Sequence, residues 1–229
     1  MKQINLRYLV FLVLLMVNFT CYAHGVDSNT EQFLTNNRDA AIGPFLYIGA
    51  KHMVTGYDHL LFLIGVIFFL FKSRDILIYV SLFTLGHSLT LLLGVFNQIN
   101  VNVYLIDAVI AFSIVYKGFD NLRGFKALFG SQPNTKIAVL IFGLFHGFGL
   151  ATKLQDFALP KENLMTNMLA FNVGVEIGQF IALLFIVTLL GFWRRHKSYI
   201  NFSTTSNMLL MTGGWVLLGY QIMGYINSQ

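Results

Sequence analysis

The sequence contains a single cysteine, Cys21, and charged side chains make up only 11% of its 229 residues. One cysteine excludes an intramolecular disulfide framework and a metal site built from several thiolates. Hydrophobic residues reach 56% and the mean hydropathy is +0.67, which is more apolar surface than a soluble globular domain needs. The composition therefore indicates a protein that faces lipid. The formal net charge is +5, and most of the basic residues lie in short loops between the apolar runs. Basic residues in such loops are typical of the cytoplasmic side of membrane proteins, so the charge does not indicate a nucleic-acid partner.

Apolar runs separated by short polar loops predict an all-α fold, a polytopic membrane bundle of about six transmembrane helices. The expected membrane-spanning segments are residues 41–71, 76–96, 103–116, 137–154, 164–193 and 208–226. The first segment is too long for one straight span of about 20 residues. We therefore expect either a short interfacial helix before the span or a break near Gly49 or Gly56.

The first 23 residues have the features of a secretory signal peptide. Lys2 and Arg7 accompany an apolar run, residues 8–17, and a cleavage site of the small-x-small type ends at Ala23. A lipoprotein site at Cys21 and an uncleaved first helix are the alternatives.

The expected domains are the signal peptide at 1–23, a short periplasmic lead at 24–40 and a transmembrane helical domain at 41–229. Cleavage would leave His24 at the mature N-terminus, where its amine and its imidazole are two nitrogen donors for a metal. A plain flexible start is the simpler interpretation of this terminus.

The positive charges predict the orientation of the bundle. A cleaved signal peptide places residue 24 outside, so the loops after the first, third and fifth spans should be cytoplasmic. Those loops contain Lys72, Arg74, Lys117, Arg123, Lys126, Lys136, Arg194, Arg195 and Lys197. We therefore expect a multi-pass protein of the bacterial inner membrane, with both the N-terminus and the C-terminus in the periplasm.

Ionisable side chains inside apolar segments are the candidate functional residues, because they are costly at membrane depth. His52, Asp58 and His59 lie at the mouth of the first long apolar run, and the two histidines, seven residues apart, share a helix face. Three later segments add His87, His146 and Glu176. Their positions along the spans predict one shared cavity near the middle of the membrane or in its outer half.

Two further observations concern carboxylates. Glu176 lies four residues after Asn172 and three before Gln179, a spacing that places all three side chains on one helix face. Asp107, near the start of the third span, is interpreted as an interfacial residue rather than a ligand.

Imidazole nitrogens combined with carboxylate oxygens suit borderline divalent cations such as nickel, cobalt, zinc or copper(II). The predicted ligand set is His52, Asp58, His59, His87, His146 and Glu176. Asp58 or Glu176 could instead fix the tautomer of a histidine. For any one of these residues, the alternative role is an interhelical hydrogen bond.

The motifs around these residues resemble a known family. His52-x5-Asp58-His59 followed by Leu-Leu-Phe-Leu, together with Phe145-His146-Gly147, is similar to the HupE/UreJ family of bacterial membrane proteins. The segment from Asn172 to Gln179 resembles the branch of that family outside the hydrogenase and urease clusters. The resemblance, which covers roughly residues 43–226, implies a secondary permease for nickel or cobalt with His52, Asp58, His59 and His146 on the metal pathway.

One position departs from the family pattern. The histidine motif of the family usually continues to a glutamate seven residues after the histidine, and Lys153 stands there in this chain. We expect Glu176 on the next span to supply the carboxylate instead.

The leading hypothesis is a secondary membrane permease that takes a divalent transition-metal cation, nickel first, from the periplasm. The sequence has no ATP-binding loop, so an ion gradient or mass action would drive the cation. An intramembrane zinc-dependent hydrolase and a metal-binding accessory protein without transport remain the alternatives. The absence of a His-Glu-x-x-His helix disfavours the hydrolase. The expected partners are the metal-ion substrate and the lipid bilayer.

Overall fold

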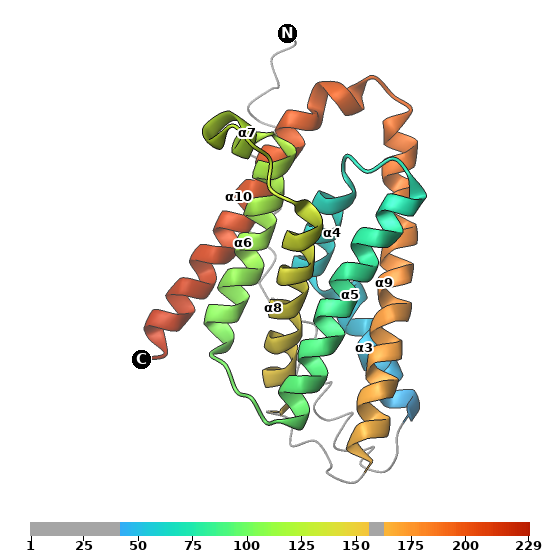
Figure 1. Cartoon of the computed structure of the whole chain (residues 1–229), viewed down its shortest axis with the longest axis vertical. Coiled ribbons are helices and arrows are strands. Elements are labelled where there is room, and N and C mark those ends of the chain that lie inside the picture. The colour runs from blue at the N-terminus through green and yellow to red at the C-terminus, as the bar shows by residue number, and fades with distance from the viewer. Residues whose placement is uncertain (1–41, 156–162) are drawn as a thin grey trace, which may run out of the picture.

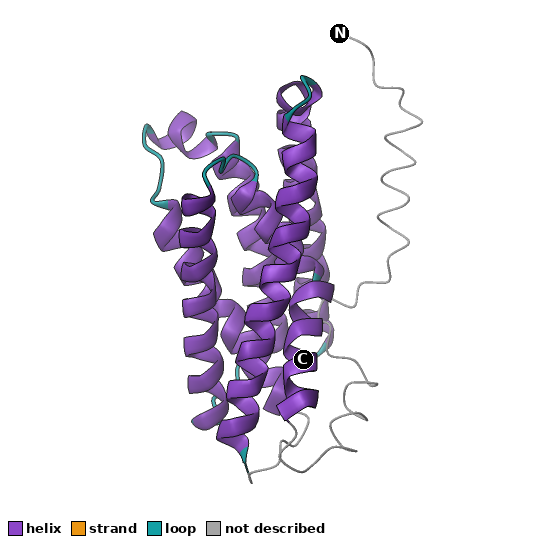
Figure 2. Ribbon diagram, turned by 90° about the vertical axis from the view of Figure 1, so that its right-hand side faces the viewer, coloured by secondary structure: helices purple, strands orange, loops and turns teal. Residues whose placement is uncertain are grey.

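The computed structural model describes residues 42–155 and 163–229, and every regular element in this part of the chain is a helix (Figure 2). The predicted signal peptide, its cleavage site, the lead and His24 lie outside the described residues. The helices are α3 (Ile42–Thr55), α4 (Tyr57–Ile67), α5 (Ser73–Phe96), α6 (Val103–Asn121), α7 (Gly124–Phe129), α8 (Thr135–Gln155), α9 (Leu164–Arg194) and α10 (Ser198–Asn227).

Four of these helices, α5, α8, α9 and α10, are long and apolar enough to cross a membrane. The interrupted pair α3–α4 and the 19-residue α6, whose apolar run contains Asp107, Lys117 and Asp120, complete a bundle of six long segments. The expected all-α membrane bundle is therefore confirmed (Figure 1).

The last helix begins earlier than its hydropathy predicts. We expected a start near residue 208, whereas α10 begins at Ser198. Its polar first turns are stable because their side chains find partners: Tyr199 donates a hydrogen bond to the Phe68 carbonyl, and the Asn207 side chain accepts one from Asn121 at 2.8 Å. Hydropathy alone does not register such contacts.

The first span breaks at Gly56, one of the two expected positions. Gly56 separates α3 from α4 and has an extended backbone, with φ −70° and ψ 108°. Its amide still donates to the His52 carbonyl at 3.0 Å. A Cβ atom at this position would lie only 2.8 Å from Nδ1 of His59 and 3.0 Å from a carboxylate oxygen of Asp58. The break therefore turns the chain at a point where only glycine leaves room for the side chains that follow.

Helices α3 and α9 form one closely packed pair, and α5 and α8 form another. The two pairs share one pattern of glycine contacts. One glycine of the first helix lies against a backbone carbonyl of the second helix, and two glycines of the second helix lie against backbone carbonyls of the first. The two glycines of the second helix follow its contacting residue by three and by seven positions. These contacts are Gly49 with Phe171, Gly174 with Leu46 and Gly178 with Ala50 in one pair, and Gly86 with Leu140, Gly143 with Phe83 and Gly147 with His87 in the other. Small residues of this kind let helix backbones approach closely.

The third pair consists of α6 and α10. The pairs α3–α9 and α5–α8 each have parallel helices, and they run in opposite directions through the bundle (Figure 1).

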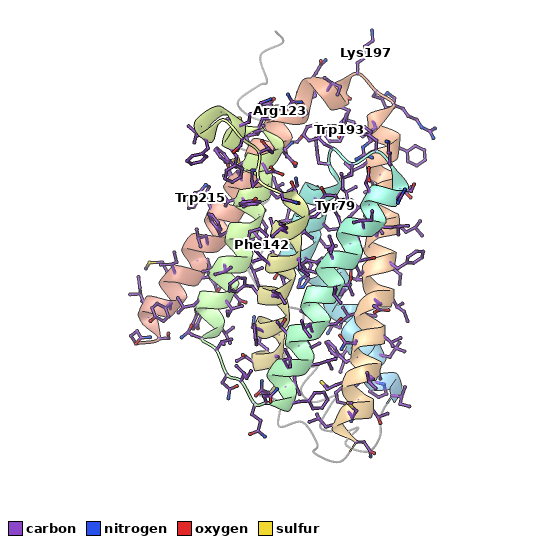
Figure 3. All side chains as sticks on the ribbon, viewed as in Figure 1. Tyr79, Arg123, Phe142, Trp193, Lys197 and Trp215 are labelled. Atoms are coloured by element: carbon purple, nitrogen blue, oxygen red, sulfur yellow. The ribbon has the colours of Figure 1, made fainter. Side chains whose placement is uncertain are left out.

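The two ends of the bundle differ in charge. The α4–α5 and α9–α10 connections and α7 lie together at the upper end in Figure 1, and Figure 3 shows Arg123 and Lys197 there. We call this the basic end, defined by Lys72, Arg74, Arg123, Lys126, Arg194, Arg195 and Lys197. The opposite end contains the α5–α6 loop, residues 97–102, which has no lysine or arginine.

Candidate metal centre

Five of the six predicted ligands converge in the interior of the bundle. They are His52 of α3, Asp58 and His59 of α4, His87 of α5 and His146 of α8, and none of them is more than 5% exposed. The break at Gly56 makes this convergence possible, since it places His52 at the end of one helix and Asp58 and His59 in the first turn of the next.

His59 lies at the centre of the cluster. Its ring centroid is 4.7 Å from that of His52, 4.7 Å from that of His146 and 6.2 Å from that of His87. The rings of His52 and His87 are 6.4 Å apart. Four imidazoles from four helices therefore share one small volume.

Hydrogen bonds fix the tautomers of two of these rings. His59 donates from Nδ1 to Oδ1 of Asp58 at 2.9 Å, and the same oxygen accepts the His59 amide at 3.0 Å. His146 donates from Nδ1 to the Phe142 carbonyl at 2.9 Å. Each ring then carries its lone pair on Nε2. A carboxylate or carbonyl behind a histidine is the arrangement that orients metal-binding imidazoles.

Four other ring nitrogens of the cluster are buried. Nε2 of His59, Nε2 of His146 and both nitrogens of His87 have no hydrogen-bond partner among the described residues. Buried polar atoms in folded proteins are nearly always paired, and each one left unpaired costs about 1–3 kcal/mol. These nitrogens are therefore available to a ligand with electron-accepting character, such as a metal cation.

The cluster divides into two overlapping groups of donors. One contains His52, His59 and His87, the other Asp58, His59 and His146, and within each group one donor atom from every residue lies within 4.8 Å of the others. Donors that share one zinc-like ion lie roughly 3–4 Å apart, as metal–nitrogen distances of about 2.1 Å require. The donors of each group are thus near enough to approach one ion, and His59 belongs to both groups.

An aromatic layer covers the cluster on the side of the basic end. It consists of Phe62, Phe83 and Phe142, each three or four residues from a histidine on the same helix. Phe62 lies 5.5 Å from Phe83 and 5.9 Å from Phe142, centroid to centroid, and Phe83 lies 4.9 Å from the ring of His146. Figure 3 shows Phe142 between α6 and α8. The packed rings separate the imidazoles from the basic end.

The other side of the cluster is polar. Asp58 and Asp107 line one cavity of about 10 Å³, close to the smallest volume that holds a water molecule. The Asp107 carboxylate accepts a hydrogen bond from the Lys153 ammonium at 2.8 Å. The interpretation of Asp107 as an interfacial residue missed this contact. The sequence did contain a signal for it, since two apolar segments each carry one of these opposite charges, and charges in such segments tend to pair.

Glu176 does not join the cluster. Its side chain is exposed on α9, so the expectation that it shares the cavity and replaces a carboxylate there is corrected. The reason is the face that α9 presents to α3, which is set by Gly174 and Gly178. Glu176 is two residues from each of these glycines, about 200° around the helix. Of its expected neighbours, Asn172 and Gln179 are buried.

Comparison with known proteins identifies the family. A family model described as HupE / UreJ protein matches residues 28–229. No curated protein and no solved structure matches the chain.

Proposed function

The chain belongs to the HupE/UreJ family, and from this premise we propose that it is a secondary permease for a divalent transition-metal cation, with nickel as the first candidate. The proposed site comprises His52, Asp58, His59, His87 and His146. The cation is the substrate of this site rather than a resident cofactor. The family match and the convergence of buried nitrogen donors both support the proposal.

The observation that carries the proposal is that two donor groups share His59. A structural metal site is closed and has one complete set of ligands. Two adjacent and incomplete sets with a common imidazole instead suit an ion that moves, since His59 can remain a ligand while the other donors are exchanged. The interrupted helix α3–α4 supports the same conclusion, because transporters commonly build ion sites at broken helices in the membrane interior.

The charge distribution supports a direction. Positively charged connections favour the cytoplasmic side, so we assign the basic end to the cytoplasm and the α5–α6 end to the periplasm of the inner membrane. The carboxylates of Asp58 and Asp107 then face the periplasmic side of the cluster. The aromatic layer separates the cluster from the cytoplasm, and the bundle must rearrange there before the cation leaves.

Transport by the purified protein tests the proposal. The protein is reconstituted into liposomes that contain a dye quenched by Ni²⁺, and quenching is followed after Ni²⁺ is added outside. His59→Asn and His146→Asn each keep a donor near the position of Nδ1 while deleting Nε2. Both variants should lose uptake, whereas Glu176→Gln, which removes an exposed carboxylate, should behave as the parent does.

The alternatives give different results in the same preparation. Liposomes that take up Ni²⁺ no faster than protein-free ones would refute the permease. Tight binding without uptake would indicate an accessory metal-binding protein, and metal-dependent hydrolysis of lipid or peptide would indicate the hydrolase.

A further inference from the structure

Lys153 lies in the last turn of α8, on the same face of the helix as His146 of the candidate metal centre. His146 and Lys153 are seven residues apart on this helix, so they share a face and are separated by a rise of about 10.5 Å. Gly149 lies between them, and a Cβ atom there would be 2.9 Å from Ile106 of α6 and 3.8 Å from the Asp107 carboxylate. This face of α8 is therefore turned toward the part of α6 that contains Asp107.

Lys153 is more exposed than the three ionisable side chains between it and the centre of the cluster. The Lys153 side chain is 17% exposed and that of Asp107 5%, while those of Asp58 and His59 are 6% and 3% exposed. Asp107 and Asp58 line the same small cavity, and Asp58 is bonded to His59. A polar series thus runs from Lys153 through the two carboxylates to the central imidazole.

We propose that Asp107 is the entry ligand for the cation, and that the Lys153 ammonium occupies this carboxylate until a divalent ion displaces it. The inference rests on the proposed function, because it requires a cation that travels to the histidine cluster. Asp107 offers carboxylate oxygens next to the cavity of Asp58, and in this structure one of them is bonded to the ammonium. Lysine suits this role, since its ammonium is a compact charge on a flexible four-carbon stem that can swing toward the surface.

The arrangement selects by charge. An ion that replaces the ammonium must compensate the loss of the Asp107–Lys153 contact, and a divalent ion attracts the carboxylate twice as strongly as a monovalent one at equal distance. Sodium and potassium should therefore leave Lys153 in place. Displacement also releases a positive charge at the mouth of the path, where it opposes the entry of a second cation.

A purely structural role is the competing explanation. The ion pair joins α6 to α8, and a lysine in the last turn of α8 also interacts favourably with the helix dipole. Such a role would affect stability without affecting the affinity for metal, and the two can be separated by measuring both.

Ni²⁺ binding to the full chain in detergent micelles is measured by titration calorimetry, together with the melting temperature. Lys153→Met should bind Ni²⁺ about tenfold more tightly, since it removes a partly buried competitor for the carboxylate. Lys153→Arg, which keeps the charge, should bind no more tightly than the parent. Lys153→Met combined with Asp107→Asn should lose the gain.

A second measurement uses the parent protein, so it does not depend on the folding of a variant. Labelling of Lys153 by an amine-reactive reagent, read by mass spectrometry, should rise when Ni²⁺ is added and should not rise with K⁺ at equal ionic strength. The inference is overturned if the parent binds Ni²⁺ while Lys153 labelling stays constant, or if Lys153→Met binds with the affinity of the parent. If neither the parent nor any Lys153 variant binds Ni²⁺, the proposed function itself fails.

Discussion

Replacing Asp58 by asparagine tests whether the histidine cluster binds a cation. The amide has the size of the carboxylate, and its oxygen can still accept the hydrogen bonds from Nδ1 and from the amide of His59, now 2.9 and 3.0 Å long. The substitution therefore keeps the orientation of the ring and removes one negative charge. For a cation held on the Nε2 side of His59, which Asp58 does not ligate, a change in affinity reports that charge.

The expected magnitude follows from the geometry. A metal held by Nε2 of His59, without Asp58 as a ligand, would lie about 2.1 Å beyond the ring, which puts it roughly 7 Å from the Asp58 carboxylate. At an effective dielectric constant of about 20, a unit charge and a divalent ion at this distance interact by ~5 kcal/mol. The amide dipole and the smaller desolvation cost of the neutral group offset part of this energy. We expect Ni²⁺ affinity to fall by about 100-fold, at the upper end of the range for residues that orient a ligand.

Titration calorimetry of the purified variant measures the change, and its melting temperature shows whether the fold is kept. Glu176→Gln is the matched control, since it removes the same charge from an exposed position on α9 and should leave the affinity unchanged. A folded Asp58→Asn variant with the affinity of the parent would refute the electrostatic role of Asp58. A loss of the same size in Glu176→Gln would show instead that the net charge of the protein, and not the cluster, controls binding.

Two further predictions concern the packing and the protonation of the site. Gly147→Ala places a methyl group against the His87 carbonyl and should destabilise the protein by ~1–3 kcal/mol. Gly191→Ala, whose added carbon meets no neighbouring helix within 4 Å, should not destabilise it. Equal melting temperatures of the two variants would contradict the packing argument. Ni²⁺ affinity should fall as the pH is lowered from about 8 to 5, because protons compete for imidazole nitrogen, and an affinity that stays constant over this range would argue against histidine ligation.

The sequence was sufficient to predict the helices and the convergence of five of the six candidate residues. Long apolar runs specify the spans, and a glycine between His52 and Asp58 marks the break of the first one. Ionisable residues are rare in such segments, so the histidines could be selected by their chemistry alone. Convergence of five residues from four helices followed from their similar depth along the spans.

The sequence did not show which face of each helix is buried. Helix α9 has exposed apolar residues on most of its surface, and a helix that is apolar all round gives no hydropathy signal for its buried face. That face is determined by contact of Gly174 and Gly178 with α3, which is a property of the tertiary structure. For this reason Glu176 was assigned to the wrong side.

The packing of the bundle suggests how the site could change. Contacts within the pairs α3–α9 and α5–α8 are close and made by backbone, whereas α5 and α9 touch only sparsely. Each donor group combines residues of α3 or α4 with a residue of the α5–α8 pair. A small rotation of one pair against the other would therefore open both donor groups while leaving the glycine contacts intact, as in transporters whose helix pairs rock around a fixed site.

A cross-link between the pairs tests this motion. Thr84 of α5 donates a hydrogen bond to the side chain of Gln179 of α9 at 2.5 Å, so cysteines at these two positions lie within the span of a short thiol-reactive cross-linker that contains a reducible disulfide. The cross-link should abolish Ni²⁺ uptake into liposomes and leave Ni²⁺ binding within about twofold of the reduced form, because it holds the pairs together without touching a donor. Reduction of the same sample should restore uptake, which controls for damage by the substitutions. Uptake that continues in the fully cross-linked protein would show that the two pairs do not move apart there, and the route past the aromatic layer would then have to open by movement of α4 alone.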